Sequence, residues 1–274
     1  MTFLRMGGAS VLPPSCLYPG ARLRVRGPVR PLPGDHIVAL GGAATFGKGA
    51  VRPWPHLLEA ATGRAVANLG AVGAGPEAYL RDPALLRACD LARAVVMEVP
   101  GAEGLCNPFY RVHPRRNDRV IEVHRPLRAL YPELDFHEVG FARALLERLR
   151  LCDPDRLAVV TEALQAAWAA RMGDLLRRIS AMTPVTLLWL GNAPVADGAV
   201  TGDKVAPPLV TRDMLEGLEQ HGVERVAALV PQPSPTGAPG LPTQAVHDAA
   251  AEALAAIWAA ARGGNSAPPN RAAG

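Results

Sequence analysis

The feature that most constrains this chain is an alternation of short apolar runs with longer segments of helical periodicity. Each apolar run is too short for an ordinary helix and stops near Gly, Pro or Asn, as buried strands do. The longest helical segment carries an apolar stripe from Leu157 to Ile179 and begins behind Asp153 or Asp155. Strands that alternate with helices form a parallel sheet, because each crossover helix returns the chain over one face of it. The predicted strands are Ile37–Leu40, Ala65–Leu69, Ala94–Val99, Val185–Leu190 and Arg225–Val230.

We therefore predict an α/β fold with three layers, in which a flavodoxin-like, five-stranded parallel sheet carries helices on both faces. A single domain over residues 35–262 follows a Pro- and Arg-rich arm, residues 1–34, and precedes a disordered tail, residues 263–274. The stretch Gly101–Tyr131 is too long for a plain connection and is expected to form an elaborated loop over the sheet edge. The predicted helices are Trp54–Ala61, Pro83–Ala88, Phe141–Leu149, Asp155–Ile179, Thr211–Gln220 and Thr243–Ala261.

Composition narrows the classes of partner. The net charge is only +4, and the arginines are scattered over several predicted helices, so we expect no nucleic-acid binding. No stretch approaches the length of an uncharged apolar membrane span, and the N-terminus is a poor signal peptide. We therefore expect a cytoplasmic protein with reduced thiols, no membrane partner, no metal and no cofactor. The cysteines, which show neither a CxxC pair nor metal-ligand spacing, are Cys16, Cys89, Cys106 and Cys152.

Glycine-rich turns follow the first two predicted strands, where ligands bind in open parallel sheets. Gly41–Gly49 follows the first strand and Asn68–Pro76 the second. Such turns let the backbone approach a ligand closely, and amides that lead into a helix suit an anion or an oxyanion. The same glycines also fit tight turns that hold no ligand, and the residues alone leave both interpretations open.

The order and spacing of these segments resemble the motif blocks of the SGNH (GDSL-type) hydrolases. Gly41–Gly47 matches the first block, Gly-Asp-Ser-x-Thr-x-Gly, in frame, and Gln244–His247 falls on the final Asp-x-x-His. The second-block glycine, an oxyanion donor in that family, falls on Gly73, and the third-block asparagine has a loose candidate in Asn107. The resemblance implies a ligand site formed by Gly42, Thr45, Lys48, Gly73 and Asn107, with His247 as a base or donor.

Two of the three groups that a serine esterase needs are missing from these blocks. Ala43 stands at the nucleophile position and Gln244 at the orienting carboxylate. Loss of the nucleophile alone removes on the order of a million-fold of rate in serine proteases. Thr45 is the nearest hydroxyl, but it is β-branched and displaced. We expect at most a divergent ester hydrolase or acyl transferase, with Thr45 and His247 as its catalytic candidates; three carboxylates elsewhere in the chain, which could also take part, are Glu98, Glu103 and Asp118.

A second resemblance, to an uncharacterised bacterial family of unknown function, covers the chain from about Gly27 to Leu149. The most specific string is Tyr110–Arg119. That family supplies no activity. The shorter shared strings are Arg26–Pro28, Thr45–Lys48, Pro53–Pro55 and Asn68–Gly70.

The basic run within that string has two interpretations. Arg115, Arg116 and Arg119 are suited to clamp one small anionic group, since guanidinium forks bind carboxylate or phosphate in pairs of hydrogen bonds. Alternatively, Asp118 and Glu122 pair with the arginines in a structural network. Our leading hypothesis is a small-molecule ligand, anionic or acylated and carbohydrate-linked, bound without conventional serine esterase activity. The alternatives are a protein-interaction module and an active esterase or transferase with a non-standard nucleophile.

Overall fold

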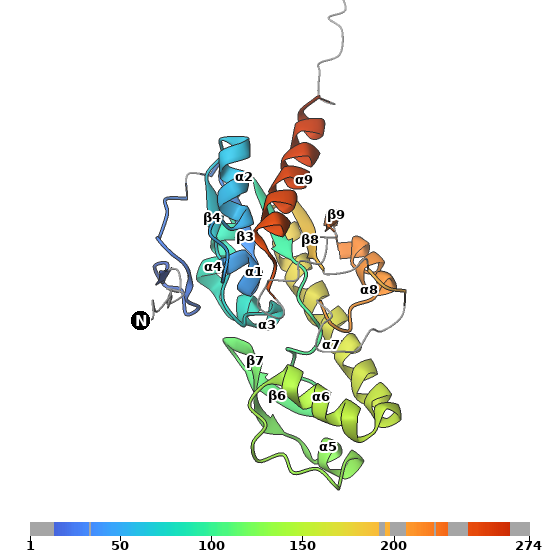
Figure 1. Ribbon diagram of the computed structural model, residues 1–274. Coiled ribbons are helices and arrows are strands. Elements are labelled where there is room, and N and C mark those ends of the chain that lie inside the picture. The colour runs from blue at the N-terminus through green and yellow to red at the C-terminus, as the bar shows by residue number, and fades with distance from the viewer. Residues whose placement is uncertain are drawn as a thin grey trace, which may run out of the picture.

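The computed structural model describes residues 14–32, 34–191, 195–197, 207–221, 223–229 and 241–263. Its centre is a sheet of five strands in the order β4-β3-β5-β8-β9, and every neighbouring pair is parallel (Figure 1). This is the flavodoxin-like winding expected from the alternating pattern, so the predicted fold class is confirmed. The strands are β3 (Ile37–Leu40), β4 (Val66–Asn68), β5 (Ala94–Glu98), β8 (Val185–Leu190) and β9 (Val223–Leu229).

The sheet is buried on both faces, because helices cover each of them. Every residue of β3 and of β8 is buried, which explains why these strands read as continuous apolar runs rather than alternating ones. The predicted strand bounds agree with the structure to within two residues, except that Val230 lies outside the described residues.

Two apolar cores lie on opposite faces of the sheet. On one face, α1 (Ala43–Phe46), α2 (Trp54–Thr62) and α9 (Gln244–Gly263) pack over alternate residues of β3, and α2 lies beside α9 (Figure 1). On the other face, α3 (Pro76–Leu80), α4 (Pro83–Asp90) and the long α7 (Pro154–Ser180) build the larger core. The structure therefore has the three expected layers.

The helix boundaries follow local sequence signals. The α7 helix begins at Pro154, and the Asp153 side chain caps it by accepting hydrogen bonds from the backbone N–H groups of Asp155 and Arg156, each over 3.0 Å. The α2 helix ends at Thr62 and is followed by the capping residue Gly63, which adopts φ +67°. The predicted helix Thr211–Gln220 divides into α8 (Arg212–Glu216) and a 3-10 turn, η1 (Glu219–His221).

The predicted loop Gly101–Tyr131 contains regular structure, which corrects that expectation. It holds an antiparallel pair, β6 (Tyr110–His113) with β7 (Arg116–Val123), followed by α5 (Arg125–Leu130). Tyr110 and Val112 of β6 face the core and the exposed Arg111 lies between them, so the alternating strand pattern is present in the sequence of β6. Together with α6 (Ala142–Cys152), these elements form a lobe at one end of the molecule, at the bottom of Figure 1.

The described part of the N-terminal arm lies on the domain. It forms a short antiparallel pair, β1 (Ser15–Cys16) with β2 (Val25–Arg26). Asp82 Oδ2 accepts hydrogen bonds from the N–H groups of Arg22 (2.7 Å) and Leu23 (2.8 Å), which joins the arm to the head of α4. Residues 1–13 of the arm and 264–274 of the predicted tail lie outside the described residues. Within the part of the chain that the structure describes, every helix is too short or too polar to span a bilayer.

Candidate functional site

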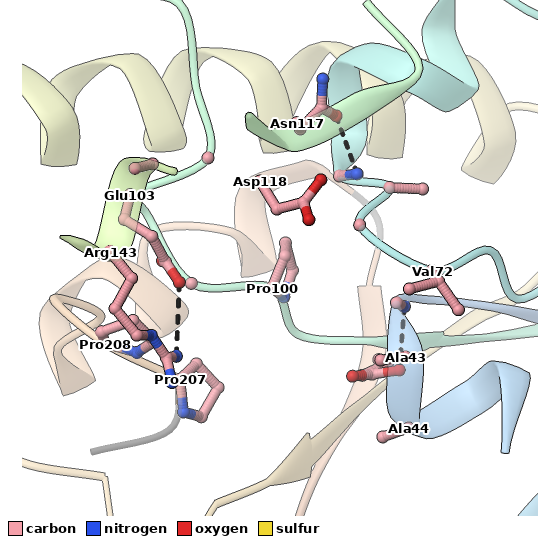
Figure 2. Close-up of a pocket in the computed structure, with 18 of the residues that line it drawn as sticks. Ala43, Ala44, Val72, Pro100, Glu103, Asn117, Asp118, Arg143, Pro207 and Pro208 are labelled. Carbon is pink, nitrogen blue, oxygen red and sulfur yellow. Dashed lines mark hydrogen bonds and ion pairs between the residues drawn. The ribbon is translucent and has the colours of Figure 1, made fainter. Parts of the chain in front are cut away.

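A cavity of about 390 Å³ opens at the carboxyl ends of the sheet strands (Figure 2). Its walls come from the turns after β3, β4 and β5, from the start of β7 and from the start of α6, with residues 207–208 and 241–242 at one side. The glycine-rich turns therefore meet at one site, as the strand order predicts. Of the predicted site residues, those that line this cavity are Gly42, Lys48 and Gly73.

The head of α1 is occupied by a carboxylate of the protein itself. Glu98, the last residue of β5, places Oε2 within hydrogen-bond distance of the N–H groups of Gly42 (3.0 Å) and Thr45 (2.9 Å) and of the Thr45 hydroxyl (2.5 Å). The N-terminus of a helix attracts anions, and here Glu98 fills that position. Burial raises the pKa of Glu98, against the hydrogen bonds from Thr45 and Gly42, which lower it.

Thr45 lies behind the cavity wall rather than in it. Its side chain is fully buried, and Oγ1 donates to Glu98 while accepting a hydrogen bond from the Trp54 indole Nε1 over 3.3 Å. Both hydrogen-bonding functions of the hydroxyl are thus used by neighbours. Thr45 consequently positions Glu98 and has no open path to a ligand.

The second glycine turn packs closely against the start of β7. Gly73 has φ +76°, and a Cβ there would lie 2.3 Å from Asp118 Oδ1, so only glycine fits. The Asn117 amide oxygen accepts a hydrogen bond from the Gly75 N–H over 2.8 Å (dashed in Figure 2). These contacts bring Asn117 and Asp118 into the cavity wall.

The basic run pairs with its own acidic neighbours instead of facing the cavity. Arg116 donates two hydrogen bonds to Asp118, over 3.1 and 2.9 Å, and Arg111 forms an ion pair with Glu122. Arg119 stacks over the ring of Phe141, with its guanidinium carbon 4.7 Å from the ring centre. The structure therefore matches the network interpretation. None of the three residues of the anion-clamp interpretation lines the cavity; these are Arg115, Arg116 and Arg119.

A second carboxylate, Glu103, stands in the loop after β5. Its Oε1 lies 3.5 Å from a guanidinium nitrogen of Arg143, at the start of α6, and Oε2 is buried without a hydrogen-bond partner among the described residues. Burial raises the pKa of Glu103, and the charge of Arg143 lowers it. Lys48, which also lines the cavity, forms no ion pair with a described residue.

Asn107 has a local structural role away from the cavity. Its side-chain oxygen accepts hydrogen bonds from the N–H groups of Phe109 (2.8 Å) and Tyr110 (3.2 Å), and its amide donates to the Leu105 carbonyl. This pattern shapes the turn that leads into β6. Asn107 is not among the residues that line the cavity.

His247 and Gln244 fasten α9 to the start of α2. His247 is fully buried, and its Nδ1 accepts a hydrogen bond from the backbone N–H of Trp54 over 3.2 Å. Gln244 donates to the Arg52 carbonyl and accepts from the Arg52 N–H. Burial lowers the pKa of His247 to about 4. Neither side chain lines the cavity.

Two cavity residues, Phe141 and Arg143, were not anticipated from the sequence. Both lie at the start of α6, which comes to the cavity only through the fold of the lobe. Glu98 carried a readable signal, because it is a single charge at the end of an apolar strand. No group of three or more His, Cys, Asp or Glu side chains with metal-binding geometry occurs among the described residues.

Comparisons with known proteins identify a family but no activity. Residues 1–264 match the family model described as "Domain of unknown function (DUF6473)". A carbohydrate esterase family 2 enzyme with a carbohydrate-binding domain, from Corynascus thermopiles (Myceliophthora fergusii), is 18% identical with a TM-score of 0.48, over 87% of this chain and 69% of that one. An acetyl xylan esterase from the rumen bacterium Butyrivibrio proteoclasticus is 11% identical with a TM-score of 0.43, over 88% and 66%. No curated protein matches the chain.

Proposed function

The chain belongs to the DUF6473 family of domains of unknown function, and we propose that it binds a small polar ligand at the carboxyl ends of its sheet without the chemistry of a serine esterase. The observation that carries the proposal is the cavity of about 390 Å³ with Ala43 in its wall, at the head of α1. Its volume lies within the range of small-molecule sites, roughly 300–1,000 Å³.

The absence of a hydroxyl or thiol nucleophile among the described lining residues supports the second half of this proposal. Among the described residues, the cavity lining includes no serine, threonine or cysteine. Thr45 is the nearest hydroxyl along the chain, and its proton is already committed to Glu98. Covalent acyl transfer needs a nucleophile that a base can deprotonate.

The position of the proton on the His247 ring also argues against the chemistry of a serine esterase. Because Nδ1 accepts the Trp54 N–H, the proton of the neutral ring must be on Nε2. A general base for a serine needs the opposite arrangement, with Nδ1 protonated toward a carboxylate and Nε2 free to accept. His247 therefore acts as a cap for the first turn of α2.

The polar groups of the cavity favour a ligand that donates hydrogen bonds. Carboxyl oxygens are strong hydrogen-bond acceptors, and the lining contains three such groups, those of Glu98, Glu103 and Asp118. An anion would be repelled by these groups, and the helix head that would attract it is filled by Glu98. The proposed ligand is accordingly a hydroxyl-bearing or acylated molecule, in preference to the anionic one expected from the arginines.

We also propose a cytoplasmic location. It is supported by the four cysteines, all of which are free in the structure.

Two measurements test the proposal. The variant Ala43→Ser with Gln244→Asp restores both missing esterase groups, and we expect neither it nor the wild type to be labelled by a fluorophosphonate probe. Labelling of the double variant would show that His247 can serve as a base and would refute the chemical argument. For binding, acetate esters of glucose and xylose are titrated while the amide resonances of Gly42, Gly73 and Asn117 are followed by NMR. Shifts confined to this group support the proposal, and its binding half fails if neither these esters nor the parent sugars shift them.

A further inference from the structure

An exposed aromatic ring stands at the edge of the cavity. Phe141 lines the cavity and remains 44% exposed. Arg119 stacks on the ring at 4.7 Å, and its backbone pairs with that of Phe141, so the ring is held in place from β7. A rigid, partly exposed aromatic ring supplies contact area at low entropic cost.

The position of Phe141 in α6 is unfavourable for the helix. Phe141 is the N-cap residue, and no side-chain hydrogen bond caps the helix there. Ser, Thr, Asp or Asn at this position typically stabilises a helix by about 1 kcal/mol. A residue that breaks a local folding rule and faces a cavity is a candidate for ligand binding.

Glu98, in the wall of the cavity, offers one oxygen that accepts no hydrogen bond from the described residues. Its Oε2 accepts three hydrogen bonds from Gly42 and Thr45, whereas Oε1 accepts none from the described residues. A Cβ on Gly42 would lie 3.7 Å from Oε1, which places that oxygen beside the α1 head in the cavity wall. Oε1 is therefore fixed in position and free to accept a hydrogen bond from a ligand hydroxyl.

The remaining charges disfavour an ionic ligand of either sign. Asp118 is paired with Arg116, and Glu103 with Arg143, so these carboxylates are partly neutralised but still face an anion. A cation would meet Lys48 and the guanidinium of Arg143 in the same lining. A neutral ligand avoids both costs, since its hydroxyl groups can donate to acceptors without bringing a charge into the cavity.

Taking the aromatic edge, the fixed acceptor and the charge balance together, we infer that the cavity takes a neutral sugar ring, stacked on Phe141 and hydrogen-bonded through a hydroxyl to Glu98 Oε1. This inference rests on the proposed function and specifies its ligand class. Phe141 and Glu98 are then the residues that determine specificity, with Arg119 and Thr45 as their positioning residues.

Three probes with one ring and different charge test the inference: glucose, glucosamine and glucuronate. Affinities are measured by NMR titration of the full chain, read from the amides of Gly42, Gly73 and Asn117. We expect glucose to bind more tightly than either charged sugar. Glucuronate or glucosamine binding as tightly as glucose would overturn the inference while leaving a ligand-binding cavity in place.

Variants test the two residues directly. Phe141→Ala should weaken glucose binding by about tenfold, whereas Phe141→Tyr, which keeps the ring, should stay close to wild type. Glu98→Gln retains an oxygen for the α1 head but turns an amide toward the ligand, and should also weaken binding. Leu151→Ala is the matched control, because Leu151 is an exposed apolar residue of the same helix that lies outside the cavity lining.

The possible outcomes distinguish a failure of the sugar-ring inference from a failure of the proposed function. Unchanged affinity in Phe141→Ala refutes the stacking, even if glucose binds in the cavity. If no sugar of the three shifts the cavity amides but the acetate esters do, the inference fails and the proposed function stands. If nothing shifts them, both fail. Each variant is first compared with the wild type by thermal unfolding, and Phe141→Leu, which removes the aromatic ring but keeps most of the apolar volume, serves in place of the alanine if that variant does not fold.

Discussion

Replacing Thr45 with valine removes one oxygen atom from the buried network behind the cavity and changes little else. Valine has nearly the same shape, so no cavity is created. The change leaves the Trp54 Nε1–H without its acceptor and takes from Glu98 the hydrogen bond of 2.5 Å. Because Thr45 is fully buried, water does not replace the lost hydroxyl at the indole.

The expected decrease in the free energy of unfolding follows from the loss of these two hydrogen bonds. An unsatisfied buried N–H costs about 1–3 kcal/mol, and a hydrogen bond to a charged group contributes about 1.5–3 kcal/mol. Glu98 still keeps the two backbone N–H donors at the head of α1 and faces the cavity, which lets it recover part of its loss. We therefore expect Thr45→Val to lower the free energy of unfolding by about 3 kcal/mol, a large part of the roughly 5–15 kcal/mol typical of a domain.

The matched control is Thr45→Ser, which keeps the hydroxyl and loses one methyl group. It should cost only about 1 kcal/mol. Urea unfolding followed by circular dichroism gives both free energies, and equal slopes with urea would confirm that the unfolded states are comparable. If the valine variant proves as stable as the serine variant, the hydroxyl does not hold Glu98 and Trp54 in place, and the network assigned to this side chain is wrong.

Two further predictions concern the elements around the site. Burial lowers the pKa of His247 from 6.5 to about 4, so the folded protein resists protonation there; its stabilising effect is present above pH 6.5 and is lost as the pH falls through about 4. Relative to His247→Gln, the wild type should lose about 3 kcal/mol of unfolding free energy over that range, and parallel pH profiles would contradict this. Asp82→Ala should release the N-terminal arm, because it removes the acceptor of the Arg22 and Leu23 N–H groups; it also removes the cap of α4 at the Leu85 N–H, and the total cost should be about 2–4 kcal/mol of unfolding free energy. Release of the arm is measured by limited proteolysis within residues 14–32. Asp82→Asn is the control, because it keeps an oxygen that can accept a hydrogen bond. If the arm stays protected from the protease in the alanine variant, Asp82 does not anchor it.

The sheet and its helices could be predicted from the sequence because each element shows its own hydrophobic pattern over several residues. A buried parallel strand such as β8 is apolar at nearly every position, and a helix such as α7 shows its period over many turns. The β6–β7 pair was missed because β7 lacks an apolar alternation: it buries Asn117 and Val120, and its register with β6 is irregular. The pairing of β7 with the antiparallel strand β6 explains this pattern, and the sequence of β7 alone does not.

The site was accessible only in part, because its walls come from segments far apart in the chain. The glycine turns could be placed at the strand ends by topology alone. The packing of Asp118 against Gly73 and the approach of Phe141 to the same cavity depend on how the lobe folds back on the sheet. The pairing of Arg116 with Asp118, two residues away, was one of two arrangements that the sequence allowed, and spacing could not decide between them.

The position of Glu98 shows how the glycine turn after β3 is used within this structure, as a support for a carboxylate of the protein itself. A carboxylate at the end of an apolar strand is costly to bury unless donors surround it. The head of α1 supplies those donors, in the N–H groups of Gly42 and Thr45, and Thr45 adds its hydroxyl. These amides would otherwise be available for an anion or an oxyanion. Because β5 ends in glutamate, the turn that leads into α1 becomes a fixed support for a carboxylate, and the wall of the cavity presents a hydrogen-bond acceptor.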